Sequence, residues 1–276
     1  MRFAKYQGVG NDFVMFADPN DELRLTPELV RRLCDRRFGI GADGVIRVAP
    51  GDGAAFFMDY FNSDGSVGEM CGNGIRCLAV FAHDEGLTDS AELGVATRSG
   101  LKIVTVRDDG NVRVDMGPPI FAPSAVPVSV QGEEALHVKV EVGDEVYEAA
   151  CLSMGNPHAV LFVEDPGDSP VTTLGPRIER HSLFPNGANV EFVRVASPER
   201  IETRVWERGS GETLACGTGA CAAAVAARLL GGTNESVTVA LPGGDLQVEW
   251  TGSLDTESPV FMTGPAVKSF EGDVEL

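Results

Sequence analysis

Two short segments of the 276-residue sequence each place a cysteine on a glycine turn directly before a strongly apolar segment. They read CGNG at 71–74 and CGTG at 216–219. If each apolar segment is a helix, its first N–H groups and the positive end of its dipole attract an anion, and the glycines let a ligand approach the backbone. A thiol at such a turn is expected to have its pKa lowered from ~8.5 into the range ~3.5–7.5, which makes thiolate available near neutral pH.

Two such thiols on opposite sides of one carboxylate-bearing carbon favour a specific reaction. One thiolate removes the α-proton and the other thiol returns a proton from the opposite face, which inverts the stereocentre. A helix dipole contributes only ~0.3–2 kcal/mol, whereas charge-assisted N–H hydrogen bonds contribute ~1.5–3 kcal/mol each. We therefore expect both glycine turns to bind the carboxylate next to the reacting carbon.

The remaining cysteines have a simpler interpretation. Cys34, Cys77, Cys151 and Cys221 lie inside helix or strand patterns without a paired glycine turn, and cysteine is often buried as a small apolar residue. We interpret these four as packing residues. The absence of a CxxC pair argues against a structural zinc site, and we expect no metal.

The two cysteine turns belong to a longer internal repeat. Three matches share an offset of 145 residues: Gly10-Asn11 with Gly155-Asn156, Asn62 with Glu207, and Cys71-Gly72 with Cys216-Gly217. Gly117 in MGPP and Gly264 in MTGPA match at 147, and 38–44 matches 184–190 more weakly at 146. One Gly-Asn match means little among 33 glycines, but several in the same order predict two related halves.

Local patterns predict the elements that carry these turns. Strands are expected at 54–61, 101–106, 111–116 and 136–142, and a helix at 27–36 is expected to be capped by Thr26 with Pro27 at its first position. The segment after Cys216 is apolar on every side for nearly three turns, which is typical of an enclosed helix. We expect an α/β (α+β) fold with a sheet wrapped around a central helix in each half. The expected domains are 1–117 plus 264–276, and 118–263, joined by the proline-rich segment 117–127.

The net charge and the apolar stretches of the sequence limit the kinds of partner that the protein is expected to bind. Lys+Arg 22 against Asp+Glu 41 gives a formal charge of -19, which repels phosphate backbones and anionic lipid, so nucleic-acid binding is not expected. No apolar stretch reaches the ~18 residues of a membrane span, and the N-terminus lacks the apolar core of a signal peptide. We expect a cytoplasmic protein with reduced cysteines and a small-molecule substrate.

The sequence resembles diaminopimelate epimerase, a pyridoxal-phosphate-independent epimerase of lysine and cell-wall biosynthesis. The matching segments cover nearly the whole chain: GNDFV at 10–14, FNSDGS at 61–66, CGNGIRC at 71–77, SMGNPH at 153–158, the turn ending in Asn189, ERGSGETLACGTGAC at 207–221 and LPGG at 241–244. The resemblance implies interconversion of LL- and meso-2,6-diaminopimelate. It also implies two pseudo-symmetric domains with the active site in the cleft between them, a homodimer, and no metal or organic cofactor.

The resemblance also implies roles for individual residues. Cys71 and Cys216 match the two acid/base thiols, while His158 and Glu207 match thiol-assisting positions. The residues that match substrate-binding positions are Asn11, Asn62, Gly72, Asn73, Asn156, Asn189, Glu207, Arg208, Gly217 and Thr218. Arg208 suits the distal carboxylate because a guanidinium is a planar, bidentate donor.

Two positions depart from the common family pattern. Gly44 stands where many members have glutamine, so one substrate hydrogen bond is expected to be missing or supplied by water, and Thr218 stands where serine is common.

Three other functions compete with the epimerase. One alternative is a two-cysteine racemase of proline or hydroxyproline, which has little use for the residues that would bind the distal end of diaminopimelate. A thiol hydrolase using Cys216 with His158 leaves Cys71 unexplained. A non-catalytic binding protein on the same scaffold would be favoured if either thiol were absent, and both are present.

Overall fold

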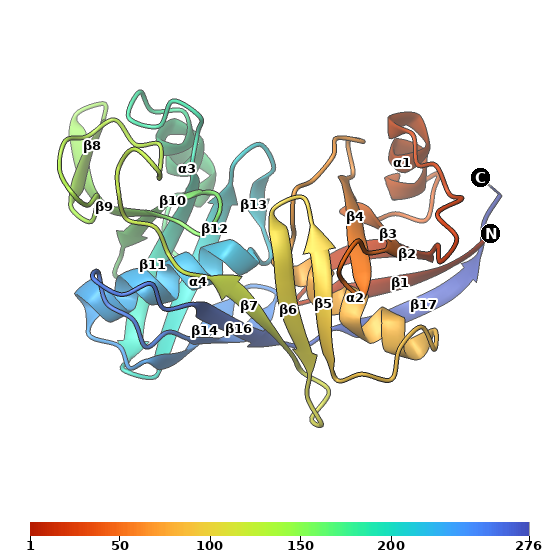
Figure 1. Ribbon diagram of the computed structural model, residues 1–276. Helices are drawn as coiled ribbons and strands as arrows, with labels where there is room; N and C mark the ends of the chain where they lie inside the picture. Colours follow the sequence, from red (N-terminus) through yellow and green to blue (C-terminus); the bar gives the residue numbers. More distant parts are fainter. Residues whose placement is uncertain (276) are drawn as a thin grey trace. The chain divides into compact units, whose positions relative to one another are not determined.

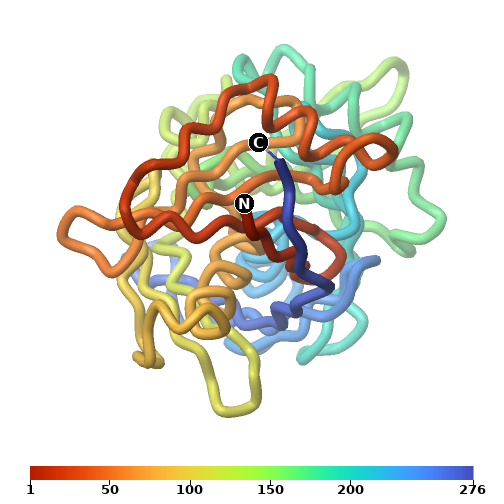
Figure 2. Tube along the Cα trace, turned by 90° about the vertical axis from the view of Figure 1, so that its right-hand side faces the viewer, coloured from red at the N-terminus to blue at the C-terminus, as the bar shows by residue number. Residues whose placement is uncertain are grey.

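The computed structural model describes residues 1–275, and the chain divides into two compact units. Unit 1 contains Met1–Asp115 and the C-terminal segment that begins at Thr263, and unit 2 contains Met116–Met262. The two ends of the chain meet in unit 1, where Met1 and Val274 exchange backbone hydrogen bonds (Figure 2). Among the described residues, no helix is long and apolar enough to cross a membrane.

Unit 1 is built on a mixed sheet. Its strands follow the order β17 (Val267–Asp273), β1 (Arg2–Gly8), β2 (Asn11–Ala17), β3 (Gly44–Pro50), β4 (Phe56–Asn62), β5 (Glu92–Thr97), β6 (Gly100–Val106) and β7 (Val112–Gly117). The β2–β3 and β4–β5 pairs are parallel, and each is connected through a helix, α1 (Pro27–Cys34) or α2 (Gly72–Asp84). The longer helix, α2, is the central one, since it packs against β1, β2, β3 and β6.

The first helix shows how local chemistry sets its ends. Thr26 caps α1 by accepting the N–H of Leu29, and Pro27 occupies the first turn as expected. The helix ends at Cys34, two residues earlier than the predicted 36. The Asp35 carboxylate accepts the N–H groups of Arg37 and Phe38, which forms a turn in place of another helical turn.

Unit 2 repeats this arrangement. Its strands are β8 (Val138–Val142), β9 (Glu145–Ser153), β10 (Pro157–Phe162), β11 (Asn189–Ser197), β12 (Arg200–Glu207), β13 (Gly211–Thr213), β14 (Ser236–Leu241) and β15 (Gly244–Glu249), followed by β16 (Val260–Gly264), which ends in unit 1. The parallel pairs are now β10–β11 and β12–β14, connected through α3 (Val171–Glu179) and α4 (Gly217–Ala226). The two faces of this sheet are covered by different helices (Figure 1).

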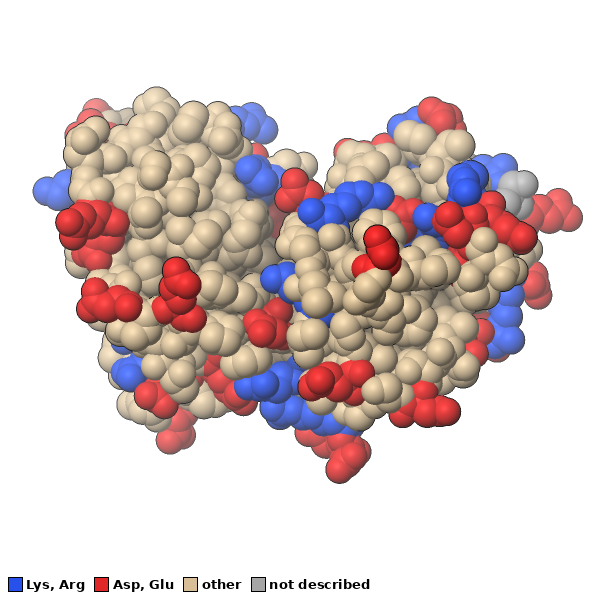
Figure 3. All heavy atoms as spheres, in the orientation of Figure 1, with Lys and Arg blue, Asp and Glu red and all other residues tan. Residues whose placement is uncertain are grey.

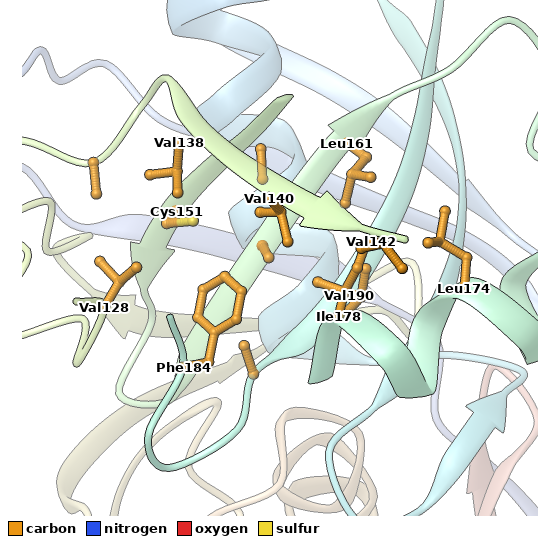
Figure 4. Close-up of a cluster of buried hydrophobic side chains, with 14 of the residues drawn as sticks. Val128, Val138, Val140, Val142, Cys151, Leu161, Leu174, Ile178, Phe184 and Val190 are labelled. Carbon is orange, nitrogen blue, oxygen red and sulfur yellow. The ribbon is translucent and has the colours of Figure 1, made fainter. Parts of the chain in front are cut away.

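The apolar core of unit 2 lies on the α3 side of the sheet. Figure 4 shows Val138, Val140 and Val142 of β8 above Val190 of β11, with Leu174 and Ile178 of α3 beside them. On the other side, α4 packs against β9, β10, β11, β12, β14 and β15 and is almost wholly buried, as its apolar sequence predicts. The helix continues through a π-turn at Ala227–Gly231 and stops at Gly232, whose φ of 75° is left-handed.

The strand registers define which residues correspond in the two units. Phe13 pairs with Gly44 in unit 1, and His158 pairs with Asn189 in unit 2, so both pairs lie at an offset of 145. The weaker match at 146 is therefore wrong by one residue on these strands. The predicted α+β class, with a sheet wrapped around a central helix in each half, is confirmed. Acidic side chains are spread over the visible surface, with lysine and arginine between them (Figure 3).

Candidate active site

Both cysteines of the repeat cap a central helix. Cys71 is the N-cap residue of α2 and Cys216 is that of α4, each with extended backbone angles. The Gly74 N–H donates to the Cys71 sulfur at 3.5 Å, and the Gly219 N–H donates to the Cys216 sulfur at 3.4 Å. Each sulfur therefore lies at a helix start, where backbone N–H groups and the helix dipole favour negative charge.

In unit 1, Asn11 holds the cysteine turn from the start of β2. Its side-chain oxygen accepts hydrogen bonds from the Cys71 thiol at 3.5 Å and from the Asn73 amide at 3.1 Å. Its own amide group donates to Asp43 at 2.8 Å. The structure thus brings together Asn11, Cys71 and Asn73, which the sequence had placed in one site.

A buried arginine supports the same turn and was missed in the sequence. Arg76 is fully buried, and its guanidinium donates to the Gly72 carbonyl at 3.1 Å and to the Asn73 side-chain oxygen at 3.0 Å. Because Asn73 has its oxygen taken by Arg76, its amide group points to Asn11. A cation inside an otherwise apolar helical segment is the signal that could have revealed it.

Asn62 lies at the end of β4, and Tyr60 fixes its orientation. The Tyr60 hydroxyl donates to the Asn62 side-chain oxygen at 2.7 Å, and the Asn62 amide donates to Ser66 at 3.0 Å. A Cβ at Gly44 would lie 2.7 Å from the Tyr60 ring and 2.6 Å from the Phe61 carbonyl oxygen. The Tyr60 ring therefore lies directly against Gly44, and a side chain at this position would require the ring to shift.

In unit 2, three ionisable side chains lie on the sheet face that packs against α4. They are His158 at the start of β10, Glu191 in β11 and Glu207 at the end of β12. Ala159, Val190 and Phe192 alternate with them and belong to the core on the α3 side. Strand alternation thus directs these three groups toward the helix that Cys216 caps.

The Cys216 thiol interacts with the Glu207 carboxylate. Burial raises the pKa of Glu207, although hydrogen bonds from Thr213 and Cys216 lower it in part. Burial and the charges of Glu207 and Glu191 raise the pKa of the Cys216 thiol well above its usual value. The expected lowering of this pKa by the helix start is therefore wrong for Cys216, because burial and, after it, the nearby carboxylates outweigh the helix N–H groups.

His158 is fully buried, and both of its ring nitrogens are engaged. Its Nδ1 lies 2.7 Å from Oε1 of Glu191, and its Nε2 lies 2.9 Å from Oδ1 of Asn156. Neither nitrogen is left to activate Cys216, which argues against the thiol hydrolase. Glu191 was missed in the sequence, and an acidic residue inside the apolar strand NVEFV is the signal that could have revealed it.

The remaining predicted residues of unit 2 lie around the same helix start and the end of β12. Asn189 donates to the Pro157 carbonyl at 3.2 Å and accepts the Arg208 N–H at 2.8 Å, so its amide is used within the unit. The exposed Arg208 side chain donates to the Asn186 carbonyl at 3.1 Å. Gly217 is buried in the first turn of α4, and the Thr218 hydroxyl lies 3.5 Å from the Cys216 sulfur.

The described residues contain no group of three or more His, Cys, Asp or Glu side chains arranged to hold a metal ion. The ionisable groups around Cys216 are instead paired with one another, His158 with Glu191 and Cys216 with Glu207. Their arrangement suits proton transfer between neighbouring side chains.

Solved structures of low sequence identity share this fold. A phenazine biosynthesis protein of the PhzF family from Bacillus anthracis matches with a TM-score of 0.71 at 17% identity, covering 100% of this chain and 99% of that one. A probable proline racemase from Agrobacterium radiobacter, with bound carbonate, matches with a TM-score of 0.70 at 17% identity, covering 100% and 93%. These matches show a shared fold, and within it the chain belongs to the proteins built from two related halves, each with a central helix that a cysteine caps.

Sequence comparison identifies the family within this class. The family model described as diaminopimelate epimerase matches residues 3–122 and 150–269, once in each half. Diaminopimelate epimerase of Moorella thermoacetica is 50% identical over 281 residues, covering 100% of both chains. That of Synechococcus elongatus is 48% identical, covering 100% of this chain and 99% of the relative. The chain belongs to the diaminopimelate epimerase family, and the predicted family, isomerase class and epimerase function are confirmed.

Proposed function

We propose that the protein interconverts LL-2,6-diaminopimelate and meso-2,6-diaminopimelate in lysine biosynthesis, by proton transfer at one α-carbon and without a cofactor. One observation supports this proposal more than any other. Cys71 and Cys216 occupy corresponding positions in the two halves. Each is the N-cap of a buried helix whose first residue is a glycine. A duplicated thiol at a duplicated anion site suits a reaction that needs an acid and a base on opposite faces of one carbon.

In the proposed mechanism, one cysteine as thiolate takes the α-proton, and the electron pair of the broken C–H bond remains on carbon and the adjacent carboxylate. The other cysteine, as thiol, then gives its proton to the opposite face and becomes the thiolate. The backbone N–H groups of Gly72, Asn73, Gly217 and Thr218 bind the carboxylate and stabilise its growing charge. One proton is removed and one is added, so no redox partner is required.

Glu207 controls the proton of Cys216 in this proposal. Because its pKa is raised, Cys216 rests as the thiol, the form that donates a proton to the carbanion. To act as the base in the reverse direction, it first passes its proton to Glu207, whose own pKa is raised by burial. When the proton shared by His158 and Glu191 lies on Nδ1, the charged ring lowers the pKa of Glu207 in part, and we assign His158 an indirect, thiol-assisting role through Glu207 on this ground.

The polar residues around the two helix starts are assigned to substrate binding. We assign the exposed guanidinium of Arg208 to the distal carboxylate, since only one of its donors is used by Asn186. Glu207 is also available to the distal ammonium. The remaining assignments are Asn11, Asn62, Asn156 and Asn189, of which Asn189 acts by holding the Arg208 backbone.

We also propose that the protein works in the cytoplasm as a homodimer. The two thiols must stay reduced, and none of the six cysteines forms a disulfide in the structure. A dimer is supported by β17, at one end of the strand series of unit 1, where Val267 and Phe270 are about half exposed. Sedimentation equilibrium of the purified protein tests the dimer, and a monomer at micromolar concentration contradicts it.

The epimerase proposal is tested by incubating the purified protein with LL-diaminopimelate in heavy water. The expected result is meso-diaminopimelate carrying one deuterium at the inverted α-carbon, without added pyridoxal phosphate or metal. Proline and hydroxyproline serve as control substrates, because they lack the distal groups that Arg208 and Glu207 would bind. Turnover of proline but not of diaminopimelate favours the proline racemase alternative, and no turnover of either contradicts the proposal.

A further inference from the structure

Glu191 occupies a position that the fold fills with an apolar residue in the other half. The strand registers relate Ile46 of β3 to Glu191 of β11, and Phe13 of β2 to His158 of β10. A Cβ at Gly74 would lie 2.8 Å from the end of Ile46, and a Cβ at Gly219 would lie 2.8 Å from Oε1 of Glu191. The apolar pair Phe13 and Ile46 beneath α2 is thus replaced beneath α4 by the ionisable pair His158 and Glu191.

This replacement is unfavourable for folding, so stability does not explain it. Glu191 and His158 are both fully buried, and the second carboxylate oxygen of Glu191 has no hydrogen-bond partner among the described residues. An unpaired buried oxygen costs free energy that an isoleucine side chain does not. Buried ionisable groups without a structural need are common where a protein holds a functional side chain in place.

The hydrogen bonds of the pair fix where its protons lie. The Asn156 oxygen at 2.9 Å from Nε2 accepts a hydrogen bond, so Nε2 carries a proton. On the other side of the ring, Nδ1 and the Glu191 oxygen are 2.7 Å apart and share one proton. Whether that proton lies on nitrogen or on oxygen, the pair has no net charge. Burial raises the pKa of Glu191, which favours keeping this proton in the pair.

The hydrogen bonds of the His158 ring also orient the side chain of Asn156, which is only half-buried. Its oxygen is taken by His158, so its N–H₂ group is the end that points away from the ring. An N–H₂ group binds a carboxylate, whereas an amide oxygen in the same place repels one.

We propose that Glu191 is a positioning residue of the epimerase: it holds His158 through Nδ1, so that Nε2–H fixes the Asn156 amide with its N–H₂ group directed at a substrate carboxylate. This inference rests on the proposed function for the identity of the substrate. It concerns the geometry of Glu191, His158 and Asn156, which is measurable without turnover.

The test compares two substitutions of Glu191. Glu191→Ile introduces the residue of the corresponding position in unit 1 and removes the partner of Nδ1. We expect its KM for diaminopimelate to rise about tenfold, the scale of one hydrogen bond to a charged group. In Glu191→Gln, the amide N–H₂ group donates to Nδ1 and keeps the proton on Nε2, so its KM should stay within about threefold of the unsubstituted protein.

A double-mutant cycle with Asn156→Ala separates positioning from a general structural effect. If Glu191 acts through Asn156, then Glu191→Ile should raise KM no further once Asn156 is alanine. Glu179→Gln, at another buried glutamate of unit 2 on the opposite face of the sheet, is the matched control and should leave the His158 signals unchanged. An unchanged KM in Glu191→Ile, equal losses in the two Glu191 variants, or additive effects in the cycle would each overturn the proposal.

A spectroscopic measurement decides the question even if Glu191→Ile does not fold. With only four histidines in the chain, nitrogen NMR resolves the ring of His158. We expect Nε2 of His158 to carry a proton in the unsubstituted protein and in Glu191→Gln, because the Asn156 oxygen accepts a hydrogen bond from it. An unprotonated Nε2 overturns the proposal. A protein that does not epimerise diaminopimelate but shows the protonated Nε2 contradicts the proposed function and leaves the positioning geometry established.

Discussion

The Cys216 thiol and the Glu207 carboxylate interact, and burial makes each of them hold its proton more tightly than in water. A thiol of raised pKa is a poor base unless a neighbouring group accepts its proton. We therefore expect Glu207→Gln to lower kcat about 10²- to 10⁴-fold, the usual contribution of a general base. Steady-state kinetics in both directions measure the loss.

The neighbouring Glu212→Gln is the matched control for Glu207. Glu212 lies in β13 and forms an ion pair with Arg204 at 2.7 Å, away from the thiol. Its substitution should leave kcat within about twofold, because an exposed ion pair contributes little. Full activity in Glu207→Gln would show that Cys216 exchanges its proton without this carboxylate.

The raised pKa of Cys216 predicts the pH dependence of its alkylation. A raised pKa means less thiolate at a given pH, so iodoacetamide should label Cys216 slowly at pH 7 and faster only as the pH passes the usual range of a thiol. In Glu207→Gln the nearby negative charge is gone, and the profile should move to lower pH. Mass spectrometry of a Cys71→Ser background isolates the Cys216 label. A Cys216 that reacts fully at pH 6 would contradict the carboxylate effect.

Much of the fold was predictable because its signals are local and occur twice. The two glycine turns lead directly into α2 and α4, which begin at Gly72 and Gly217. The end of α1 at Cys34 and the π-turn after Ala226 were not predicted. The end of α1 depends on a turn that the Asp35 side chain forms by hydrogen bonding. Both α1 and α4 have a composition that suits a longer helix, so the sequence does not indicate where either changes its geometry.

The site residues that lie within family motifs could be predicted from the sequence. Residues that reach the site only through contacts between distant segments could not. Glu191 lies 33 residues from His158 and is brought to it by the parallel pairing of β10 and β11. The pKa of Cys216 differs from the expectation for the same reason. A helix start is visible in the sequence, whereas the burial that raises this pKa most, and the two carboxylates that add to it, come from distant strands. Periodicity indicates which face a residue occupies but not its partner.

Tyr60 offers a test of how Asn62 is oriented. Its hydroxyl donates to Asn62, and its ring fills the space beside Gly44. We expect Tyr60→Phe to raise KM about threefold with little change in kcat, because one hydrogen bond that fixes a binding residue is lost. Tyr147→Phe, whose hydroxyl donates to the exposed Glu145, is the control and should change neither constant. An unchanged KM in Tyr60→Phe would show that Asn62 does not need this contact.

Arg208 is expected to determine selectivity for the distal end of the substrate. Arg208→Ala should raise KM at least tenfold, since a bidentate hydrogen bond to a carboxylate is lost. DD-diaminopimelate should be a poor substrate for the unsubstituted protein, because Arg208 and Glu207 would bind a distal centre of L configuration. Arg200→Ala, which removes a surface pair with Asp245, is the control. Unchanged kinetic constants in Arg208→Ala would remove this residue from the site.

The duplication itself is tested by removing one thiol at a time. Cys71→Ser and Cys216→Ser should each lose most epimerisation, since a serine hydroxyl is too weakly acidic to replace a thiol near neutral pH. Both should fold, because exchanging one sulfur for oxygen at a helix cap removes little buried area. Cys77→Ala and Cys221→Ala, at fully buried packing positions, are the controls and should stay within a few-fold of full activity.

The preference of each serine variant for one stereoisomer tests the two-thiol mechanism more specifically than the loss of epimerisation does. If the two thiols act on opposite faces of one carbon, each serine variant keeps a thiol on one face only. An analogue with a leaving group next to the α-carbon requires only proton removal, so each variant should still eliminate that group from one stereoisomer, and the two variants should prefer opposite isomers. Chiral chromatography of the unreacted analogue measures the preference. If both variants consumed the same isomer, the two thiols would not act from opposite faces. Full epimerase activity in either variant would show that its substituted cysteine is a packing residue.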